Sequence, residues 1–456
     1  MHLFLVQSSF SLNRNKIMNT LPIAIIGAGP VGLAAAAHLA VRDIPFLVFE
    51  AGATVAANIL SWRHIRVFSP WKYNIDKAAR QLLDAASWQS PHDEDLPTGE
   101  ELFEKYFKPL AELPILRGNI HLNSKVLSVG RKNRDKMKTA SRETLPFVIR
   151  VLEGYDVNNY EVRAVIDATG TWNSPNPVGS GGVYAVGEIE NAGQIFYGIP
   201  DILGKYSDRY KNKRVLVVGS GHSSINAILE LDKLKDKYPD TEINWVMRKE
   251  KISDVYGGQE DDALQARGEL GIRIEQLVNN DRVNVYTPFN IEQIRNENGL
   301  LKIVGFQHER KYALPPVDEI ISNTGSRPDF SFLREVRINI DPALESVAEI
   351  AELIDPNIHS CGTVRPHGEE ELRQPEKDFY IVGSKSYGRA PTFLMATGYE
   401  QVRSIVAALD GDFEAARNVE LELPETGVCS VDLGSTSCCG AEGKSEAKPV
   451  KTACCG

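Results

Sequence analysis

Cysteine is scarce in this sequence and is concentrated at one end. Of the six cysteines in 456 residues, only Cys361 lies in the body of the chain. A disulfide framework requires paired cysteines that join distant segments, so no such framework holds this body together. The other five fall in the last 28 residues: Cys429, Cys438, Cys439, Cys454 and Cys455.

Long apolar runs and an excess of positive charge are also missing. No stretch approaches the roughly 20 apolar residues that span a bilayer. The net charge of −10 argues against a nucleic-acid partner, which needs a basic face. Residues 1–7 are briefly apolar but lack the basic region of a secretion signal. We therefore expect a cytoplasmic protein without a membrane or nucleic-acid partner, and a disordered extension over residues 1–18.

The length and an ordinary hydrophobic content of 42% allow two or three domains. Residues 21–50 read as strand, glycine turn, helix and strand, and residues 213–249 repeat that order. Each copy is followed later by an apolar strand that ends in Thr-Gly, at Gly170 and at Gly325. A further strand at 379–383 precedes an expected helix over 393–409. Two copies of one βαβ unit predict two nucleotide-binding domains.

The order of these segments predicts an α/β fold with two Rossmann-like dinucleotide-binding domains, the second inserted into a discontinuous first. Residues beyond about 423 are rich in Gly, Ser, Lys and Cys and lose periodicity. The expected ranges are 19–200 and 330–422 for an FAD domain, 201–329 for an NADPH domain, and 423–456 for a flexible cysteine-rich tail.

The first glycine turn carries the full GxGxxG pattern. A first glycine makes the tight turn, the second lets the backbone approach a pyrophosphate, and the third allows close helix–strand packing. An acid, Glu50, ends the next strand and suits a ribose diol. The predicted nucleotide contacts are Gly27, Gly29, Pro30, Gly32 and Glu50.

The second glycine turn departs from the pattern, with Ser224 at the third glycine position. The strand after it ends in Arg248 and Lys249 instead of an acid. Two cations there favour a 2′-phosphate, and hence NADPH over NADH, although a solvated basic pair would look the same. His222 either contacts the pyrophosphate or faces solvent. The loop candidates are Gly219, Gly221, His222, Ser223 and Ser224.

With both loops placed, the chain resembles the flavin-containing monooxygenase-like branch of two-dinucleotide-binding flavoproteins. The resemblance rests on the two loops, on Leu96-Pro-Thr-Gly99 and on the two Thr-Gly strands, and spans residues 22–410. It implies FAD at the first loop and NADPH at the second. It also implies cofactor contacts at Thr169, Gly170, Thr324 and Gly325, and at Lys385, Tyr387 and Arg389, which lie where that family meets the flavin's pyrimidine end.

The chain also departs from that family near the flavin. Ile202 stands where the family's Phe-x-Gly-x-x-x-His segment has His. Where such monooxygenases commonly have Asn-x-Pro, this sequence has Ser69-Pro70, so the resemblance leaves Ser69 or Asn74 for the role of that Asn. Trp62 and Trp71 would cover the isoalloxazine, or are simply core residues. The catalytic candidates are therefore Ser69, Trp71 and Asn74, with Trp62 as a flavin contact.

The scarcity of cysteine in the body of the chain limits the chemistry that a bound flavin could carry out. A disulfide reductase of this architecture needs a cysteine pair beside the flavin, and Cys361 is alone in the body. NADPH would then reduce FAD, and molecular oxygen would accept the electrons, with or without oxygenation of a small molecule or metalloid. Soft thiolates bind thiophilic ions, and the chain looks like flavin monooxygenases associated with arsenic resistance. The candidate ligands for a trivalent arsenical are Cys361, Cys429, Cys438, Cys439, Cys454 and Cys455.

Other functions stay open at this point. One is an N- or S-monooxygenase of a small organic molecule, and another is an NADPH-dependent reductase for a partner acceptor. A third is a metal-binding or redox-sensing protein that uses FAD without turnover. The alternative to arsenical capture is a tail that chelates metal non-specifically or is dispensable. The sequence predicts no oligomeric state.

Overall fold

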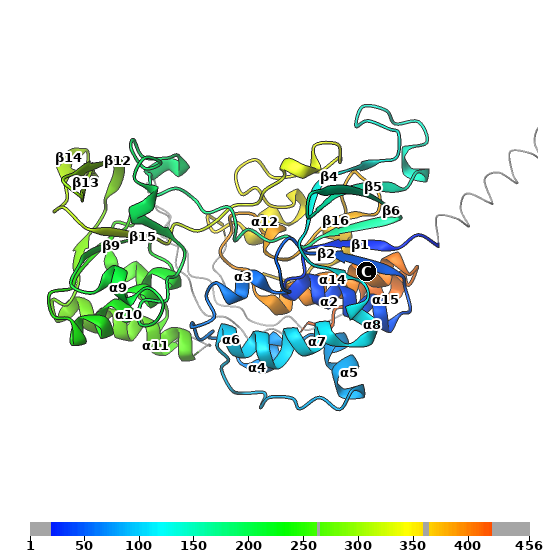
Figure 1. The fold of residues 1–456 in the computed structure, drawn as a ribbon, viewed down its shortest axis with the longest axis horizontal. Helices are drawn as coiled ribbons and strands as arrows, with labels where there is room; N and C mark the ends of the chain where they lie inside the picture. Colours follow the sequence, from blue (N-terminus) through cyan, green and yellow to red (C-terminus); the bar gives the residue numbers. More distant parts are fainter. Residues whose placement is uncertain (1–19, 262–264, 359–363, 422–456) are drawn as a thin grey trace, which may run out of the picture.

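Two parallel β-sheets lie in separate halves of the molecule (Figure 1). The computed structural model describes residues 20–261, 265–358 and 364–421. Neighbouring strands within each of these sheets run parallel. Parallel sheets are covered on both faces, which explains why their strands read as uninterrupted apolar runs.

The first sheet has helices on one face and an antiparallel meander on the other (Figure 1). Its central strand, β1 (Ile23–Ile26), is wholly buried. The Ala-rich helix α2 (Pro30–Val41) is buried almost all round because it also packs against α14 (Met395–Leu409) and α5 (Lys77–Ala85). In spatial order the strands are β16 (Phe379–Ile381), β7 (Ala164–Asp167), β1 (Ile23–Ile26), β2 (Phe46–Phe49) and β3 (Ile120–His121). The helices are α2 (Pro30–Val41), α5 (Lys77–Ala85) and α14 (Met395–Leu409), and the meander is β4 (Ser124–Arg131), β5 (Phe147–Glu153) and β6 (Asp156–Val162).

The second sheet repeats the plan with its own meander. In spatial order its strands are β11 (Asn284–Tyr286), β10 (Glu242–Val246), β9 (Arg214–Val218), β15 (Glu319–Ser322) and β8 (Ile195–Tyr197). The helices are α10 (His222–Lys237) and α11 (Gln265–Asn279), and the meander is β12 (Asn290–Glu297), β13 (Leu300–Gln307) and β14 (Arg310–Ala313). The predicted fold class, two Rossmann-like domains with the second inserted in the first, is confirmed.

Short helices complete the structure, and most belong to the first half. They are α3 (Ala57–Leu60), α4 (Trp71–Asn74), α6 (Gly99–Leu102), the π-helical turn η1 (Phe103–Phe107), α7 (Lys108–Glu112), α8 (Pro114–Arg117), α9 (Ser207–Tyr210), α12 (Ala351–Ile354), α13 (Glu369–Leu372) and α15 (Phe413–Arg417). Within the described ranges, no helix has the length and apolarity needed to cross a membrane.

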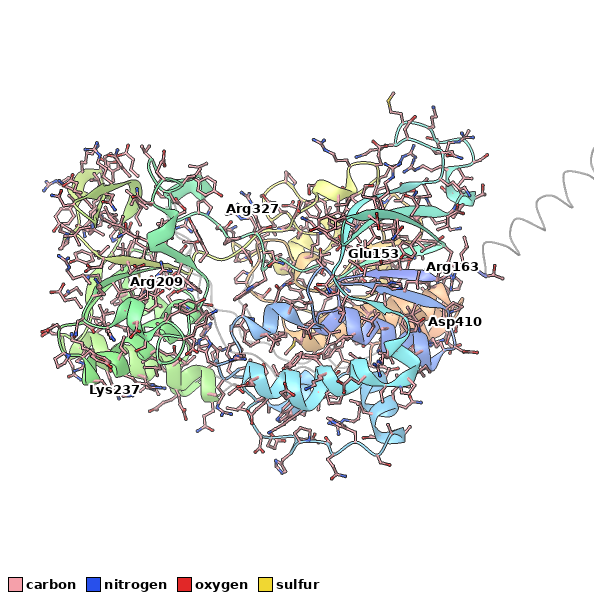
Figure 2. All side chains as sticks on the ribbon, viewed as in Figure 1. Glu153, Arg163, Arg209, Lys237, Arg327 and Asp410 are labelled. Atoms are coloured by element: carbon pink, nitrogen blue, oxygen red, sulfur yellow. The ribbon has the colours of Figure 1, made fainter. Side chains whose placement is uncertain are left out.

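The chain crosses between the halves twice, and the two crossings pair with each other. Pro175 and Ser326 form an antiparallel bridge. The Asn176 N–H donates to the Gly325 carbonyl over 2.9 Å, and the Arg327 N–H donates to the Ser174 carbonyl over 2.9 Å. Figure 2 places Arg327 between the halves. Strand β8 already belongs to the second sheet, so we propose that the second domain begins near these crossings and not at residue 201.

A buried charge cluster joins the first meander to the segment before β16. Arg131 Nε donates to Glu376 Oε1 over 2.8 Å, and Arg142 Nη2 donates to Glu376 Oε2 over 2.7 Å. Burial opposes ionisation of Glu376, but the hydrogen bonds from Arg142 and Arg131 outweigh it and lower the pKa of this carboxyl. The cluster thus joins three chain segments through one carboxylate.

Replacing this carboxylate leaves two guanidinium groups buried without their counter-charge. We expect Glu376→Gln to lower the free energy of unfolding by about 3–5 kcal/mol, measured by urea unfolding at neutral pH. Because the folded pKa is lowered, the wild-type advantage is present at neutral pH and declines as the pH falls through that pKa. Glu370→Gln, at a nearby exposed position, is the control, and equal losses in both variants would contradict the expectation.

Candidate functional site

The first glycine loop is shaped by close backbone contacts. Gly27 has φ +99°, and a Cβ there would lie 2.8 Å from the Ala168 carbonyl oxygen, at the end of β7. A Cβ on Gly32 would lie 1.9 Å from the Gly27 carbonyl oxygen. Neither position therefore accepts a side chain without moving the backbone. The pattern read from the sequence corresponds to real steric limits.

Gly29 differs because the space in front of it is open. It is the N-cap of α2, Pro30 opens the helix, and no atom lies within 4 Å of a Cβ placed on Gly29. The first N–H groups of a helix lack intrahelical partners and favour an anion there. This cradle fits the diphosphate of a dinucleotide.

Glu50 is held beside the cradle by two backbone donors. Its carboxylate accepts hydrogen bonds of 2.7 Å from the Ala28 N–H and of 2.7 Å from the Gly52 N–H. A carboxylate has roughly four lone-pair sites, so two sites are left for ribose hydroxyls. The position at the end of β2 agrees with the role expected for this acid.

The second loop repeats this geometry with one difference. Gly219 has φ +129°, a Cβ there would lie 2.3 Å from the Asn323 carbonyl oxygen, and Gly221, the N-cap of α10, again faces open space. Ser224 is fully buried, and its hydroxyl has no hydrogen-bond partner among the described residues. Serine thus fits at the third glycine position, but its hydroxyl is unsatisfied. His222 and Ser223 begin α10.

The two cations after β10 have different surroundings. Arg248 is exposed and makes no ion pair with the described residues. Lys249 is partly buried, and its Nζ donates to the Asp254 carbonyl over 2.7 Å. Arg248 is therefore the better placed of the two to meet a phosphate.

The two Thr-Gly pairs lie where the chain leaves each sheet. Gly170 and Gly325 have φ of +66° and +84°. Thr169 Oγ1 donates to Asp167 Oδ1 over 2.7 Å, and Thr324 Oγ1 donates to the Asn176 carbonyl over 2.7 Å. Both threonine hydroxyls are thus used to fix the start of a crossing.

Lys385 is buried within the first half. Its Nζ lies 2.7 Å from Asp167 Oδ2 and 3.0 Å from Thr169 Oγ1, and 4.5 Å from the centre of the Phe332 ring. Its side chain is completely buried, so this ammonium ties the turn after β16 to the end of β7. Sequence reasoning placed it at the flavin but missed Asp167.

Tyr387 and Arg389 differ in their exposure to solvent. Tyr387 is buried, its ring centre 5.5 Å from that of His367, and burial raises the pKa of its hydroxyl. Arg389 is exposed, and Nη2 would lie 3.8 Å from a Cβ on Gly182, at the second half. Of the residues predicted at the pyrimidine end, only Arg389 is thus exposed.

The segment over residues 61–74 carries the predicted catalytic residues. Asn74 Nδ2 donates to the carbonyls of Ser69 over 2.6 Å and Pro70 over 3.0 Å, and the Asn74 carbonyl accepts from the Tyr399 hydroxyl over 2.9 Å. Asn74 thus holds the turn in shape. Ser69 is half-buried, whereas Trp71 is buried and lines a cavity of about 410 Å³.

This segment also contacts the second half. The Phe68 and His222 ring centres lie 5.5 Å apart, and His64 Nε2 lies 3.9 Å from Glu230 Oε2. Burial raises the pKa of Glu230 to about 7 and lowers the pKa of His64. Sequence reasoning missed Glu230, since it lies 166 positions from His64 with no local pattern to join them. Trp62 lies nearby, its ring centre 6.5 Å from that of Trp172.

All six predicted arsenical ligands lie outside the described residues. Those residues, in turn, contain no group of three or more His, Cys, Asp or Glu side chains that could hold a metal ion.

A comparison with known protein families identifies the family of this chain. A family model described as pyridine nucleotide-disulphide oxidoreductase matches residues 24–352, a range that contains both glycine loops. The chain belongs to this family. Pyridine nucleotide-disulphide oxidoreductases of this family bind FAD and NAD(P)H, which confirms the cofactors predicted from the loops. The prediction of a flavin-dependent oxidoreductase, and the resemblance to flavin-containing monooxygenase-like two-dinucleotide-binding flavoproteins, are also confirmed.

Curated relatives of this oxidoreductase include two different activities. This chain is 29% identical over 223 residues to the probable indole-3-pyruvate monooxygenase YUCCA7 of Arabidopsis thaliana, and the match covers 45% of this chain and 43% of the plant protein. It spans less than half of that relative. It is 22% identical over 353 residues to the ferredoxin–NADP reductase of Lactobacillus johnsonii, covering 76% and 86% of the two chains.

Solved structures share the fold of this oxidoreductase. The bacillithiol disulfide reductase Bdr of Bacillus cereus superposes with a TM-score of 0.64 at 17% identity, covering 87% of this chain and 99% of that one. At this identity the likeness concerns the fold alone.

The open space at Gly29 gives a test of the first loop. We expect Gly29→Val to abolish FAD binding, measured by flavin fluorescence, because its side chain would fill the cradle. The free energy of unfolding without FAD should stay within about 1 kcal/mol of wild type, since a Cβ at this position has no protein atom within 4 Å.

Gly118→Val is the matched control, because Gly118 also faces open space but lies at the end of α8. It should bind FAD like the wild type. Wild-type FAD affinity in Gly29→Val would show that FAD does not use this loop.

Proposed function

We propose that this protein is an NADPH-dependent FAD monooxygenase that oxidises a soft nucleophilic substrate, with trivalent arsenicals as the best candidates. The observation that carries the proposal is that both cradles fit dinucleotides while residues 20–261, 265–358 and 364–421 contain no cysteine. No thiol pair among these residues can take electrons from a flavin. Bound FAD supplies the redox chemistry, and the protein orients and shields it.

The overall reaction balances with oxygen as the oxidant. NADPH gives two electrons and the trivalent substrate gives two, which together reduce one molecule of oxygen. One oxygen atom is transferred to the arsenic lone pair, and the other leaves as water, whose two hydrogens correspond to the hydride of NADPH and one proton from solvent. Arsenite would become arsenate, and NADPH would become NADP⁺.

We assign the roles of the chain's own residues from their positions. The loop Gly27–Gly32 with Glu50 would hold FAD, and the loop Gly219–Ser224 would hold NADPH. In the segment over residues 61–74, the Ser69 hydroxyl makes no hydrogen bond with the described residues and would face the reacting atoms. Asn74 would act by positioning Ser69, and Trp62 and Trp71 by excluding water.

Arg248 would recognise the 2′-phosphate of NADPH. It is exposed at the end of β10, where a ribose-binding acid stands in NAD-specific loops. We expect Arg248→Ala to raise the KM for NADPH by about tenfold, equivalent to about 1.4 kcal/mol, and to leave the KM for NADH unchanged. Steady-state flavin reduction with each nucleotide measures this. Arg295→Ala, also exposed in the second half, is the control, and an equal rise for both nucleotides would contradict the assignment.

We further propose that the tail cysteines capture the arsenical. Paired soft thiolates suit a thiophilic trivalent ion. Replacing Cys438, Cys439, Cys454 and Cys455 with Ser should raise the KM for arsenite by roughly tenfold and leave NADPH reduction of FAD unchanged. The measurement is arsenite-dependent oxygen uptake together with arsenate formation. Unchanged arsenite kinetics in this variant would remove the support for thiol capture.

Each curated relative favours one alternative. The Lactobacillus johnsonii ferredoxin–NADP reductase is matched over 86% of its length, which favours a reductase for a partner acceptor. Such an enzyme would show slow oxygen uptake with or without arsenite, and fast NADPH oxidation with an added acceptor protein. The plant monooxygenase favours oxidation of a small organic molecule. If this protein has that function, its turnover would not change when residues 423–456 are removed.

A further inference from the structure

The turn after β16 lies directly against the helix of the first glycine loop. We call residues 383–387 the Gly383 turn. Gly383 has φ +69°, and a Cβ there would lie 3.3 Å from a methyl group of Val31, which is in the first turn of α2. The Ser386 N–H donates to the Gly383 carbonyl over 3.0 Å and closes the turn. The position of this turn is therefore tied to the N-terminus of α2, where the FAD diphosphate fits.

One buried amide holds both ends of the Gly383 turn. Gln401, on α14, is completely buried. Its Oε1 accepts from the Gly383 N–H over 2.7 Å, and its Nε2 donates to Ser386 Oγ over 3.0 Å. The second hydrogen on Nε2 points to His367, whose Nε2 lies 2.9 Å away. All of these Gln401 contacts are within hydrogen-bonding distance.

The tautomer of His367 follows from its other contact. His367 Nδ1 lies 3.2 Å from the Arg365 carbonyl oxygen, and a carbonyl only accepts. Nδ1 must then carry the hydrogen, so that Nε2 is free to accept from Gln401. A proton added at Nε2 would face the Gln401 amino group. Turning the amide over would place that amino group against the Gly383 N–H instead.

We propose that His367 is a positioning residue for FAD, and that its neutral imidazole, through Gln401, fixes the Gly383 turn and makes FAD binding depend on the protonation of one buried histidine. This inference rests on FAD occupying the first glycine loop. It does not depend on the substrate or on oxygen.

The surroundings of His367 set the direction of the pH effect. Burial is the largest influence and lowers the pKa of His367; the hydrogen bond to the Arg365 carbonyl and the charge of Glu371 raise this pKa, and the charge of Arg365 lowers it. Arg365 and Glu371 carry opposite charges and lie 3.7 Å apart, so the effects of these two charges on the pKa of His367 oppose each other. From the other elements, Gln401 and the Tyr387 ring face the imidazole, and neither is charged at neutral pH. FAD binding is therefore strongest when His367 is neutral and is lost as the pH falls below the ordinary histidine range.

Flavin fluorescence of the full chain at a series of pH values tests the proposal, since it reports free and bound FAD without turnover. Wild-type protein should bind FAD about tenfold more weakly at about pH 4.5 than at about pH 7.5, because the lowered pKa of His367 places its protonation below the ordinary histidine range. His367→Gln should remove this dependence while keeping affinity near neutral pH, because its amide can accept from Gln401 and donate to Arg365. His367→Phe should bind weakly at every pH, with circular dichroism to show that it is folded.

His38→Gln is the matched control, since His38 is also poorly exposed and bonded, with its Nε2 3.0 Å from Asp76 Oδ2. It should keep the wild-type pH dependence. A wild-type slope in His367→Gln, or no slope in the wild type, would overturn the proposal. Absence of FAD binding in the wild type at neutral pH would instead overturn the cofactor assignment on which the proposal rests.

Discussion

The structure depends on one steric contact that occurs twice. In each half, the glycine that ends the first strand brings its Cα against a backbone carbonyl of the returning strand, Gly27 against Ala168 and Gly219 against Asn323. A side chain at either glycine would separate the two strands at their carboxyl ends. Because the strands stay close, the helix that follows starts at the sheet edge with its N–H groups facing open space. An anion can approach there at short range, so the two cradles follow from two backbone contacts.

The same contacts determine how the halves are joined. Ala168 and Asn323 are each followed by Thr-Gly, and the chain then enters a crossing that is fixed by backbone hydrogen bonds. Away from the crossings, the contact between His64 and Glu230 is 3.9 Å, and His64 Nε2 and Glu230 Oε2 are buried without a hydrogen bond. A buried ion pair whose facing atoms make no hydrogen bond contributes little to stability. The halves are thus joined by backbone hydrogen bonds at the crossings, and the His64–Glu230 contact adds little to them.

The features that sequence analysis predicted well are those that depend on local patterns. Apolar runs, glycine spacing and Thr-Gly strand ends predicted the central strands of both sheets and both glycine loops, because the physical cause of each lies within a few residues, but they did not predict the strands β3, β8 and β11. Lys385 lies on the expected turn, but its ammonium binds Asp167, which is 218 positions away, and no local pattern encodes that partner. Asn74 was predicted at the flavin, and the hydrogen bonds of its Nδ2 to the carbonyls of its own turn were not foreseen. The His367–Gln401 pair gave no sequence signal at all, because its meaning depends on three segments meeting at Gly383.

The two curated relatives are named for different reactions, so the acceptor of the electrons cannot be read from the scaffold alone. Under the proposed function, the segment over residues 61–74 lies beside the flavin. Here that segment contains tryptophan, serine and asparagine over residues 61–74, and the hydrogen bonds of Asn74 to its own turn and from Tyr399 hold it in place. Hydroxyl and indole groups cannot accept two electrons as a disulfide does. An acceptor must then come from outside this segment, and the protein's contribution is to keep water away and the geometry fixed. Under the proposed function, the rigidity of this turn therefore matters more than the chemical reactivity of any side chain in it.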